Sequence, residues 1–130
     1  MTVRAIKPSG APGALASYSP AIDTGSFVFL AGQIGLDPQT GELVDGGVEA
    51  QTERALRNVV AVLDAAGLTM ADVVKTTCFL ADIGDFDAFN SVYARFVGDP
   101  PPARSTFAVA ALPRGARVEV EAVAFRSSNG

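Results

Sequence analysis

Apolar residues recur at helical spacing in two segments of this chain. In the first segment, over 48–66, they occupy one side of a helix, at Val48, Ala55, Leu56, Val59, Val60, Leu63 and Ala66. Gly67 follows at the position where a glycine commonly ends a helix. The second helix can be capped by Asp82 or Asp85, and its apolar stripe consists of Phe86, Phe89, Tyr93 and Phe96. The pattern therefore predicts two main amphipathic helices.

Shorter segments with alternating or β-branched residues predict the strands. They are Thr2–Ile6, Ser26–Gly32, Val73–Ala81, Ser105–Ala111 and Arg117–Arg126. The segment Leu112–Ala116 suits a hairpin connection between the last two strands. Because strands and helices do not alternate strictly, the sequence favours an α+β fold with both helices on one face of a sheet.

Length and charge limit the classes of partner. The 130 residues, 48% of them hydrophobic, suit one domain that spans residues 1–130. The net charge is −4 and the chain contains no run of Lys or Arg, which argues against nucleic acid or an anionic membrane as the main partner. No stretch resembles a signal peptide or is apolar enough to span a bilayer.

The lack of histidine removes several kinds of chemistry. With no His and a single Cys78, the chain offers no zinc site, no Ser-His or Cys-His pair and no internal disulfide. No acidic cluster has the loop pattern of an oxygen-only metal site. Cys78 falls within an apolar strand, where a core residue is more common than a nucleophile. We expect no metal, and a reducing compartment, the cytoplasm.

Two charged residues near the predicted final strands could do chemistry. Arg104 follows Pro100–Pro102, which stiffen the approach to its strand, and a guanidinium held there suits a carboxylate. The alternative is an ordinary solvated arginine. Glu119 shares one strand face with Arg117 and Glu121, so one carboxylate could point into a cleft and transfer protons. A charged face of a half-exposed strand is the alternative interpretation.

A hairpin between the last two strands would separate Arg104 from Glu119. If the hairpin turns at 113–115, Glu119 lies opposite Ala110, and six residues of strand then separate it from Arg104 by roughly 20 Å. One chain could not then use both side chains on one small molecule. Either they do not cooperate or the site forms between subunits.

Three further residues are weaker candidates. Gly32 ends a strand within Ala31–Gly35 and could expose backbone groups to a ligand, although the segment by itself favours a simple tight turn. Tyr18 could offer a hydroxyl group or be a packed side chain. Asn90 could line a cleft or be polar helix surface.

Taken together, the chain resembles the reactive-intermediate deaminase family (RidA/YjgF, also called endoribonuclease L-PSP) from about Tyr18 to Phe125. The matching segments, in order, are Tyr18–Ile22, Ala31–Ile34, Asp37–Gly41, Asn58 with Ala65–Gly67, Val74–Thr77, Asp85–Phe86 with Asn90, Pro102–Ser105, Ala111–Pro113 and Val118–Ala122. Each segment is weakly specific alone, but the order and the separations are highly specific.

This resemblance implies a chorismate mutase-like α+β fold with a mixed sheet, assembled as a homotrimer with clefts between protomers. It implies a 2-iminobutanoate/2-iminopropanoate deaminase that needs no cofactor and hydrolyses imines and enamines, released by pyridoxal-phosphate enzymes, to 2-oxo acids and ammonia. A non-catalytic or differently specific trimer that binds metabolites or a protein is the alternative, and ribonuclease activity is a third.

The resemblance also implies roles for individual residues. Arg104 would clamp the substrate carboxylate and Glu119 would activate water, with substrate-binding contacts from Tyr18, Gly32, Asn90 and Thr106. Two departures from the family pattern concern the cleft: Thr106 stands where many members have cysteine, and Ala16–Pro20 differs from the common sequence around the tyrosine. Since Arg104 and Glu119 are both present, the sequence favours an active deaminase.

Overall fold

One mixed sheet organises the computed structural model, which describes residues 3–14 and 16–127. The strand order is β1-β2-β3-β6-β4-β5, and among these neighbours only β4 and β5 are parallel. The strands are β1 (Arg4–Ile6), β2 (Ala21–Asp23), β3 (Phe27–Gln33), β4 (Val73–Leu80), β5 (Ala103–Ala108) and β6 (Val118–Phe125). The helices are α1 (Gly47–Ala65) and α2 (Phe86–Tyr93), with short 3₁₀ helices η1 (Met70–Asp72), η2 (Ile83–Asp85) and η3 (Pro113–Gly115). The α+β prediction is confirmed.

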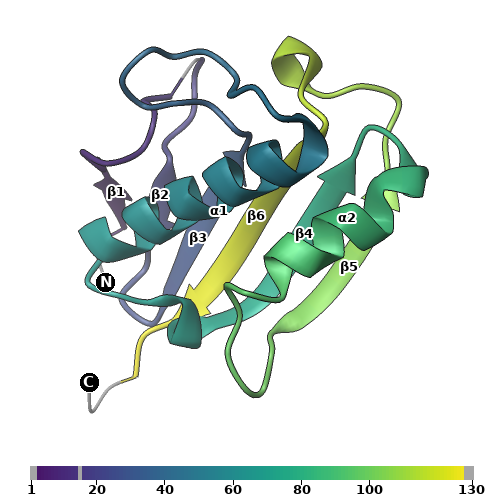
Figure 1. The fold of residues 1–130 in the computed structure, drawn as a ribbon. Helices are drawn as coiled ribbons and strands as arrows, with labels where there is room; N and C mark the ends of the chain where they lie inside the picture. The colour runs from purple at the N-terminus through teal and green to yellow at the C-terminus, as the bar shows by residue number, and fades with distance from the viewer. Residues whose placement is uncertain (1–2, 15, 128–130) are drawn as a thin grey trace.

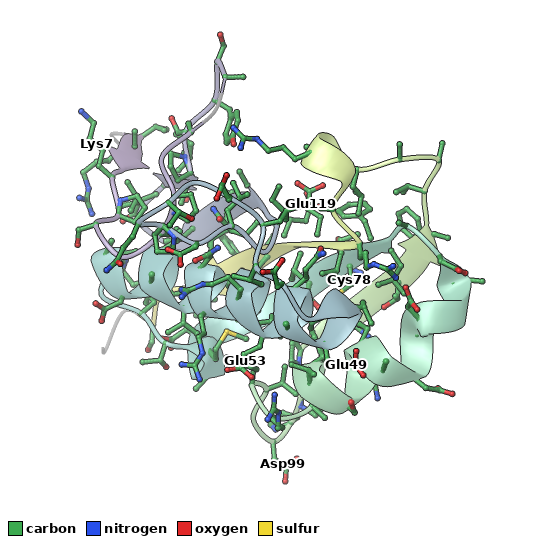
Figure 2. The ribbon with its side chains drawn as sticks, turned by 45° about the horizontal axis from the view of Figure 1, so that its top comes forward. Lys7, Glu49, Glu53, Cys78, Asp99 and Glu119 are labelled. Carbon is green, nitrogen blue, oxygen red and sulfur yellow. The ribbon has the colours of Figure 1, made fainter. Side chains whose placement is uncertain are left out.

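Both helices cover the same face of the sheet, as the sequence predicts (Figure 1). Alternate residues of β6 face them and are almost completely buried: Val118, Val120, Ala122 and Ala124. On α1 the stripe that meets this face includes Leu56, Val59 and Leu63, none of which is exposed. Cys78 lies in the same interior layer (Figure 2). Burial of these apolar side chains supplies the main driving force that holds α1 on the sheet.

The predicted hairpin between the last two strands is wrong. β6 lies between β3 and β4, and β5 pairs with the far side of β4. The reason is the helix between β4 and β5: a strand, a crossover helix and a second strand form a parallel pair. The connection through η3 then leads from β5 to the other side of β4, where β6 pairs. β6 is therefore a central strand, and its alternate residues are the most completely buried.

The remaining boundaries differ in smaller ways. β2 was not predicted as a strand, because three residues next to a turn signal carry too little pattern. β5 begins directly after the prolines at Ala103, two residues earlier than expected. α2 ends at Tyr93, before Phe96, although Phe96 still packs partly buried against the core. In the first predicted strand, Thr2 lies outside the described residues.

The sheet face away from the helices, which we call the open face, carries large apolar side chains. Phe27, Phe29, Phe107 and Phe125 are each between 40% and 49% exposed. The rings of Phe27 and Phe125 lie 5.4 Å apart, and Phe107 meets Phe79 edge-on at 5.3 Å. An apolar patch of this kind on a sheet is typical of an interaction surface.

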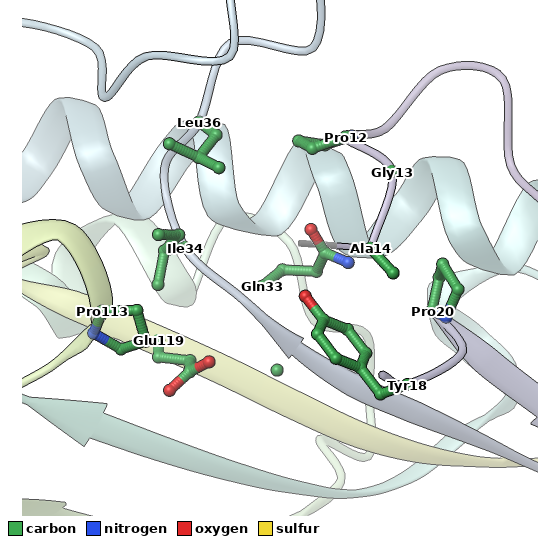
Figure 3. A pocket seen from close by; sticks show the side chains of 11 residues that line it. Pro12, Gly13, Ala14, Tyr18, Pro20, Gln33, Ile34, Leu36, Pro113 and Glu119 are labelled. Atoms are coloured by element: carbon green, nitrogen blue, oxygen red, sulfur yellow. The ribbon is translucent and has the colours of Figure 1, made fainter. Parts of the chain in front are cut away.

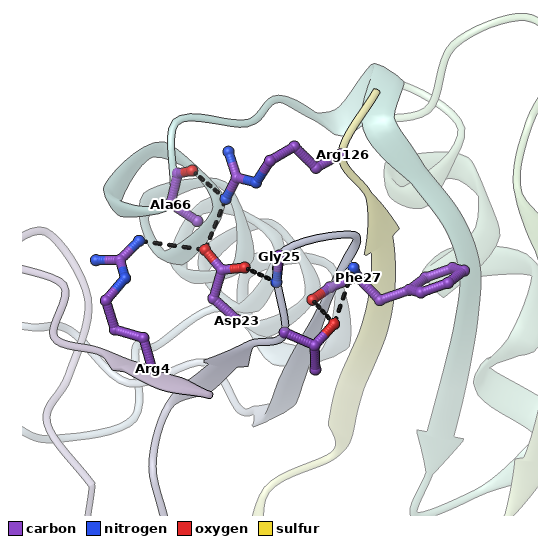
Figure 4. A network of polar contacts seen from close by, with 7 residues as sticks. Arg4, Asp23, Gly25, Phe27, Ala66 and Arg126 are labelled. Atoms are coloured by element: carbon purple, nitrogen blue, oxygen red, sulfur yellow. Dashed lines mark hydrogen bonds and ion pairs between the residues drawn. The ribbon is translucent and has the colours of Figure 1, made fainter. Parts of the chain in front are cut away.

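A buried carboxylate fastens the outer strands to α1 (Figure 4). Asp23 Oδ2 accepts hydrogen bonds from Arg126 Nη2 at 2.8 Å and Arg4 Nη2 at 3.2 Å, while its Oδ1 accepts from the Gly25 backbone at 2.8 Å. Arg126 also donates to the Ala66 carbonyl at the end of α1. The Gly25 bond, with the neighbouring arginines, lowers the pKa of Asp23 despite its burial, so this carboxylate stays charged.

Candidate functional site

Arg104 is held beneath α2 on the helix-covered face of the sheet. It pairs in register with Thr76 of β4, and its Nη1 donates to Asn90 Oδ1 at 2.7 Å. Its guanidinium lies over the ring of Tyr93, with Cζ 4.6 Å from the ring centroid, and the rings of Phe86 and Phe89 are 5.4 and 5.9 Å away. The apolar stripe of α2 thus surrounds a cation with aromatic faces.

The charge of Arg104 has no acidic partner among the described residues. The ion pairs found there involve five other arginines: Arg4, Arg57, Arg95, Arg117 and Arg126. Arg104 instead borders a cleft, here the Arg104 cleft, lined by Asn90, Tyr93, Ala94, Val97, Pro101, Pro102 and Arg104. A half-buried guanidinium that donates to a neutral amide oxygen and forms no ion pair with a described residue is suited to bind an anion.

Glu119 points to the open face from β6. Burial, with a smaller contribution from the charge of Glu121, raises its pKa. Its side chain lies across Gly32 of β3, so closely that a Cβ on Gly32 would be 2.7 Å from Glu119 Cδ. The absence of a side chain at Gly32 therefore creates the space that the carboxyl group occupies. Gly32 was predicted for its accessible backbone, and this contact adds a second reason for glycine there.

A second cleft surrounds this carboxyl group (Figure 3). The Glu119 cleft is lined by Tyr18, Gly32, Gln33, Ile34, Leu36, Pro113 and Glu119, together with residues of the 12–14 segment. Tyr18 and Glu119 come from segments far apart in sequence and border the same hollow. The cleft is small, combines apolar walls with the polar side chains of Tyr18, Gln33 and Glu119, and places the carboxyl group where a small molecule could reach it.

The two clefts share no residue. Arg104 faces α2, whereas Glu119 lies on the opposite face of the sheet, paired with Phe79, which in turn pairs with Phe107. Two interstrand spacings and three residues along β5 separate their Cα atoms by about 14 Å. The structure therefore agrees with the hypothesis that one chain cannot use both residues on one small molecule, although the hairpin pairing assumed for it is wrong.

The six residues predicted for the site fall into these two groups. Asn90 joins Arg104, and Thr106 follows two residues later on the same face, with its hydroxyl oxygen buried. Tyr18 and Gly32 join Glu119. Tyr93 was predicted only as a core residue, yet it borders the Arg104 cleft. Its position three residues after Asn90, on the same helix face, is the signal that could have placed it there.

Asn58 is a further residue whose role the sequence did not indicate. It is fully buried, and its Nδ2 donates to the carbonyl groups of Ile34 and Leu36 at 3.1 and 3.0 Å. Its Oδ1 accepts from Arg54 Nε at 3.2 Å. Because Ile34 and Leu36 line the Glu119 cleft, Asn58 fixes one wall of that cleft against α1.

Cys78 contributes no reactive thiol to either cleft. It is completely buried, and burial raises its pKa to about 11, so the thiol stays protonated near neutral pH. This agrees with the prediction that it belongs to the core. Within 3–14 and 16–127 there is no group of three or more His, Cys, Asp or Glu side chains that could hold a metal ion. None of the helices in these ranges is long and apolar enough to cross a membrane.

Known proteins are similar to this chain over nearly its whole length. The model of the family described as Endoribonuclease L-PSP matches residues 8–126. Protein DfrA of Myxococcus xanthus is 50% identical over 126 residues, which cover 95% of this chain and 96% of that protein. Human 2-iminobutanoate/2-iminopropanoate deaminase is 46% identical over 123 residues, which cover 95% of this chain and 90% of that protein.

Solved structures give the same result. The structure of E. coli TdcF with bound serine superposes with a TM-score of 0.89 at 42% identity, covering 95% of this chain and 99% of that one. RidA from an Antarctic Psychrobacter superposes with a TM-score of 0.91 at 40% identity, covering 95% and 99%.

Proposed function

Since the chain belongs to the endoribonuclease L-PSP family, which includes the RidA/YjgF proteins, we propose that it is a 2-iminobutanoate/2-iminopropanoate deaminase. The relatives at 45–50% identity include several named as such deaminases, which supports the imine deaminase function of the family. The proposed reaction hydrolyses 2-imino acids and their enamine tautomers, released by pyridoxal-phosphate enzymes, to 2-oxo acids and ammonia. It needs no cofactor.

The single observation that carries this proposal is the state of Arg104. Its guanidinium is oriented by Asn90, surrounded by aromatic rings and unpaired with any acidic side chain of the described residues. A 2-imino acid offers a planar carboxylate that matches the donor fork of arginine. Binding there would fix the position of the adjacent imine carbon, so proximity would supply much of the rate acceleration.

Glu119 would act as the general base and then as the general acid of the hydrolysis. The imine carbon is already electrophilic once its nitrogen is protonated, so the reaction needs chiefly a positioned water molecule. As the water oxygen adds to that carbon, the Glu119 carboxylate accepts a proton. It then returns the proton to the nitrogen of the carbinolamine. As the C–N bond breaks and ammonia leaves, the C=O bond of the 2-oxo acid forms and the hydroxyl proton passes back to the Glu119 carboxylate. The raised pKa of Glu119 brings this carboxyl group closer to the value suited for both steps.

Because the two clefts are separate in one chain, the proposed site lies between subunits of a homotrimer with the chorismate mutase-like architecture. The Arg104 cleft of one protomer would meet the Glu119 cleft of the next. A contact between two different surfaces repeats head to tail and closes into a ring. The exposed phenylalanines of the open face support such an assembly, because a covered apolar patch stabilises association.

A coupled hydrolysis assay tests the function. A serine or threonine dehydratase would generate 2-iminopropanoate or 2-iminobutanoate, and semicarbazide would trap the imine that remains. We expect the wild type to suppress trapping. Arg104→Ala and Glu119→Ala should each fail to suppress it, while their melting temperatures stay close to that of the wild type. If a folded wild type leaves the trapping of both imino acids unchanged, the deaminase assignment is wrong, and a trimer that binds small metabolites or a protein without catalysis becomes the better interpretation.

Two further expectations belong to this proposal. We expect no RNA cleavage, despite the family description, because the chain has a net charge of −4 and neither histidine nor a basic stripe. We also expect a cytoplasmic protein, because its single cysteine is a buried, protonated thiol that forms no disulfide within the chain.

A further inference from the structure

We propose that Tyr93 is the positioning residue for Arg104, through its ring face and through a hydroxyl group anchored to Thr76. The inference rests on the proposed function, because it concerns how the carboxylate of a 2-imino acid is recognised. It assigns to Tyr93 and Thr76 the task of holding the guanidinium plane in the orientation that receives this carboxylate.

Tyr93 contacts Arg104 through its ring and contacts Thr76, the strand neighbour of Arg104, through its hydroxyl group. Its ring is the nearest of the three that surround the guanidinium, at 4.6 Å. Its hydroxyl group lies 2.7 Å from Thr76 Oγ1. Tyr93 is 4% exposed and Thr76 is 1% exposed, so water cannot compete for this hydrogen bond.

Thr76 is a specific anchor because of its register. It pairs directly with Arg104 across the parallel strands β4 and β5. Tyr93 thus binds the strand residue beside Arg104 while its ring covers the side chain of Arg104 itself. One turn earlier on α2, Asn90 accepts a hydrogen bond from Nη1. Asn90 therefore fixes one edge of the guanidinium and Tyr93 fixes its plane, and no ion pair with a described acidic residue competes with a carboxylate ligand for this cation.

The chemistry of the phenol suits this role. Burial raises the pKa of Tyr93, so it remains neutral near physiological pH. A neutral ring attracts the guanidinium through its face without forming an ion pair that would compete with a carboxylate ligand. A phenylalanine would keep the ring but lose the anchor, and a leucine would lose both.

Two readouts test the inference: calorimetric binding of 2-oxobutanoate, the expected product, and the imine-trapping assay. For Tyr93→Leu we expect binding to be about tenfold weaker, in line with the loss of a desolvated cation–π contact. Tyr93→Phe and Thr76→Val should each weaken binding by about two- to fivefold. Their double variant should be no weaker than the stronger single effect, because both remove the same hydrogen bond.

Val92→Ala is the matched control, since Val92 is buried on α2 but does not line the Arg104 cleft. It should lower the melting temperature while leaving 2-oxobutanoate binding unchanged. The inference is overturned if Tyr93→Leu binds 2-oxobutanoate as the wild type does, or if Val92→Ala weakens binding equally at the same loss of stability. Failure of the proposed function has a different signature, in which the wild type itself neither binds the 2-oxo acid nor suppresses trapping.

Discussion

At the scale of single residues, Gly32 and Glu119 form one unit. The carboxyl side chain occupies the volume that any side chain at position 32 would fill. The sequence could not indicate this contact, because it depends on β3 and β6 being neighbours and on the bulge between Leu30 and Gln33. A glycine at the end of a strand is equally compatible with a simple turn, so only the pairing of the strands distinguishes the two explanations.

We therefore expect Gly32→Ala to lower deaminase activity by about 10- to 100-fold, because a misplaced proton-transfer group costs roughly that much. The new methyl group would push the Glu119 carboxyl group out of its position, while the fold would persist because Gly32 does not need a positive φ. The measurement is the imine-trapping assay together with the melting temperature. Gly98→Ala is the control, since a Cβ there would meet no atom within 4 Å. Unchanged activity of Gly32→Ala would contradict this account of Glu119.

At the scale of secondary structure, the sequence predicted both helices and most strands, but not how the strands pair. Helical spacing located α1 to within one residue at each end, because its stripe is long and regular. The order of β5 and β6 depended on contacts between distant segments, which a local pattern does not contain. The alternation in the last strand predicted that Glu119 lies on the charged face of that strand. The neighbours of β5 and β6 in the sheet, and with them the separation of Arg104 from Glu119, were not predictable from local patterns.

Asn58 is an example of a contact between elements that no local pattern reveals. Replacing it with leucine would leave the buried carbonyl groups of Ile34 and Leu36 without their donor. We expect Asn58→Leu to lower the free energy of unfolding by about 3 kcal/mol, since each unsatisfied buried acceptor costs about 1–3 kcal/mol. Urea denaturation measures this loss.

The Arg54→Ala variant distinguishes the hydrogen bond that Asn58 accepts from those that it donates to the cleft wall. It removes the hydrogen bond to Asn58 Oδ1 but leaves both carbonyl groups paired, so it should cost less than about 1 kcal/mol. Equal losses for the two variants would contradict the view that Asn58 acts chiefly on the cleft wall.

At the scale of the whole molecule, the separation of the two clefts requires a second protomer if Arg104 and Glu119 serve one substrate. Mixed assemblies test this directly. The Arg104→Ala chain can contribute only Glu119, and the Glu119→Ala chain can contribute only Arg104. When the two inactive variants are co-expressed in equal amounts, we expect about a quarter of the wild-type activity, because random mixing in a closed ring pairs an intact Arg104 with an intact Glu119 at that frequency.

The control mixes Arg104→Ala with the Arg104→Ala/Glu119→Ala double variant, in which no intact pair can form. Light scattering on the same samples gives the number of subunits. Recovery of activity only in the first mixture would mean that each site contains residues of two chains. No recovery, from mixtures shown to exchange subunits, would mean that Arg104 and Glu119 do not serve one shared substrate. Completion of a catalytic site by assembly would then not explain why the phenylalanines of the open face are exposed in one chain.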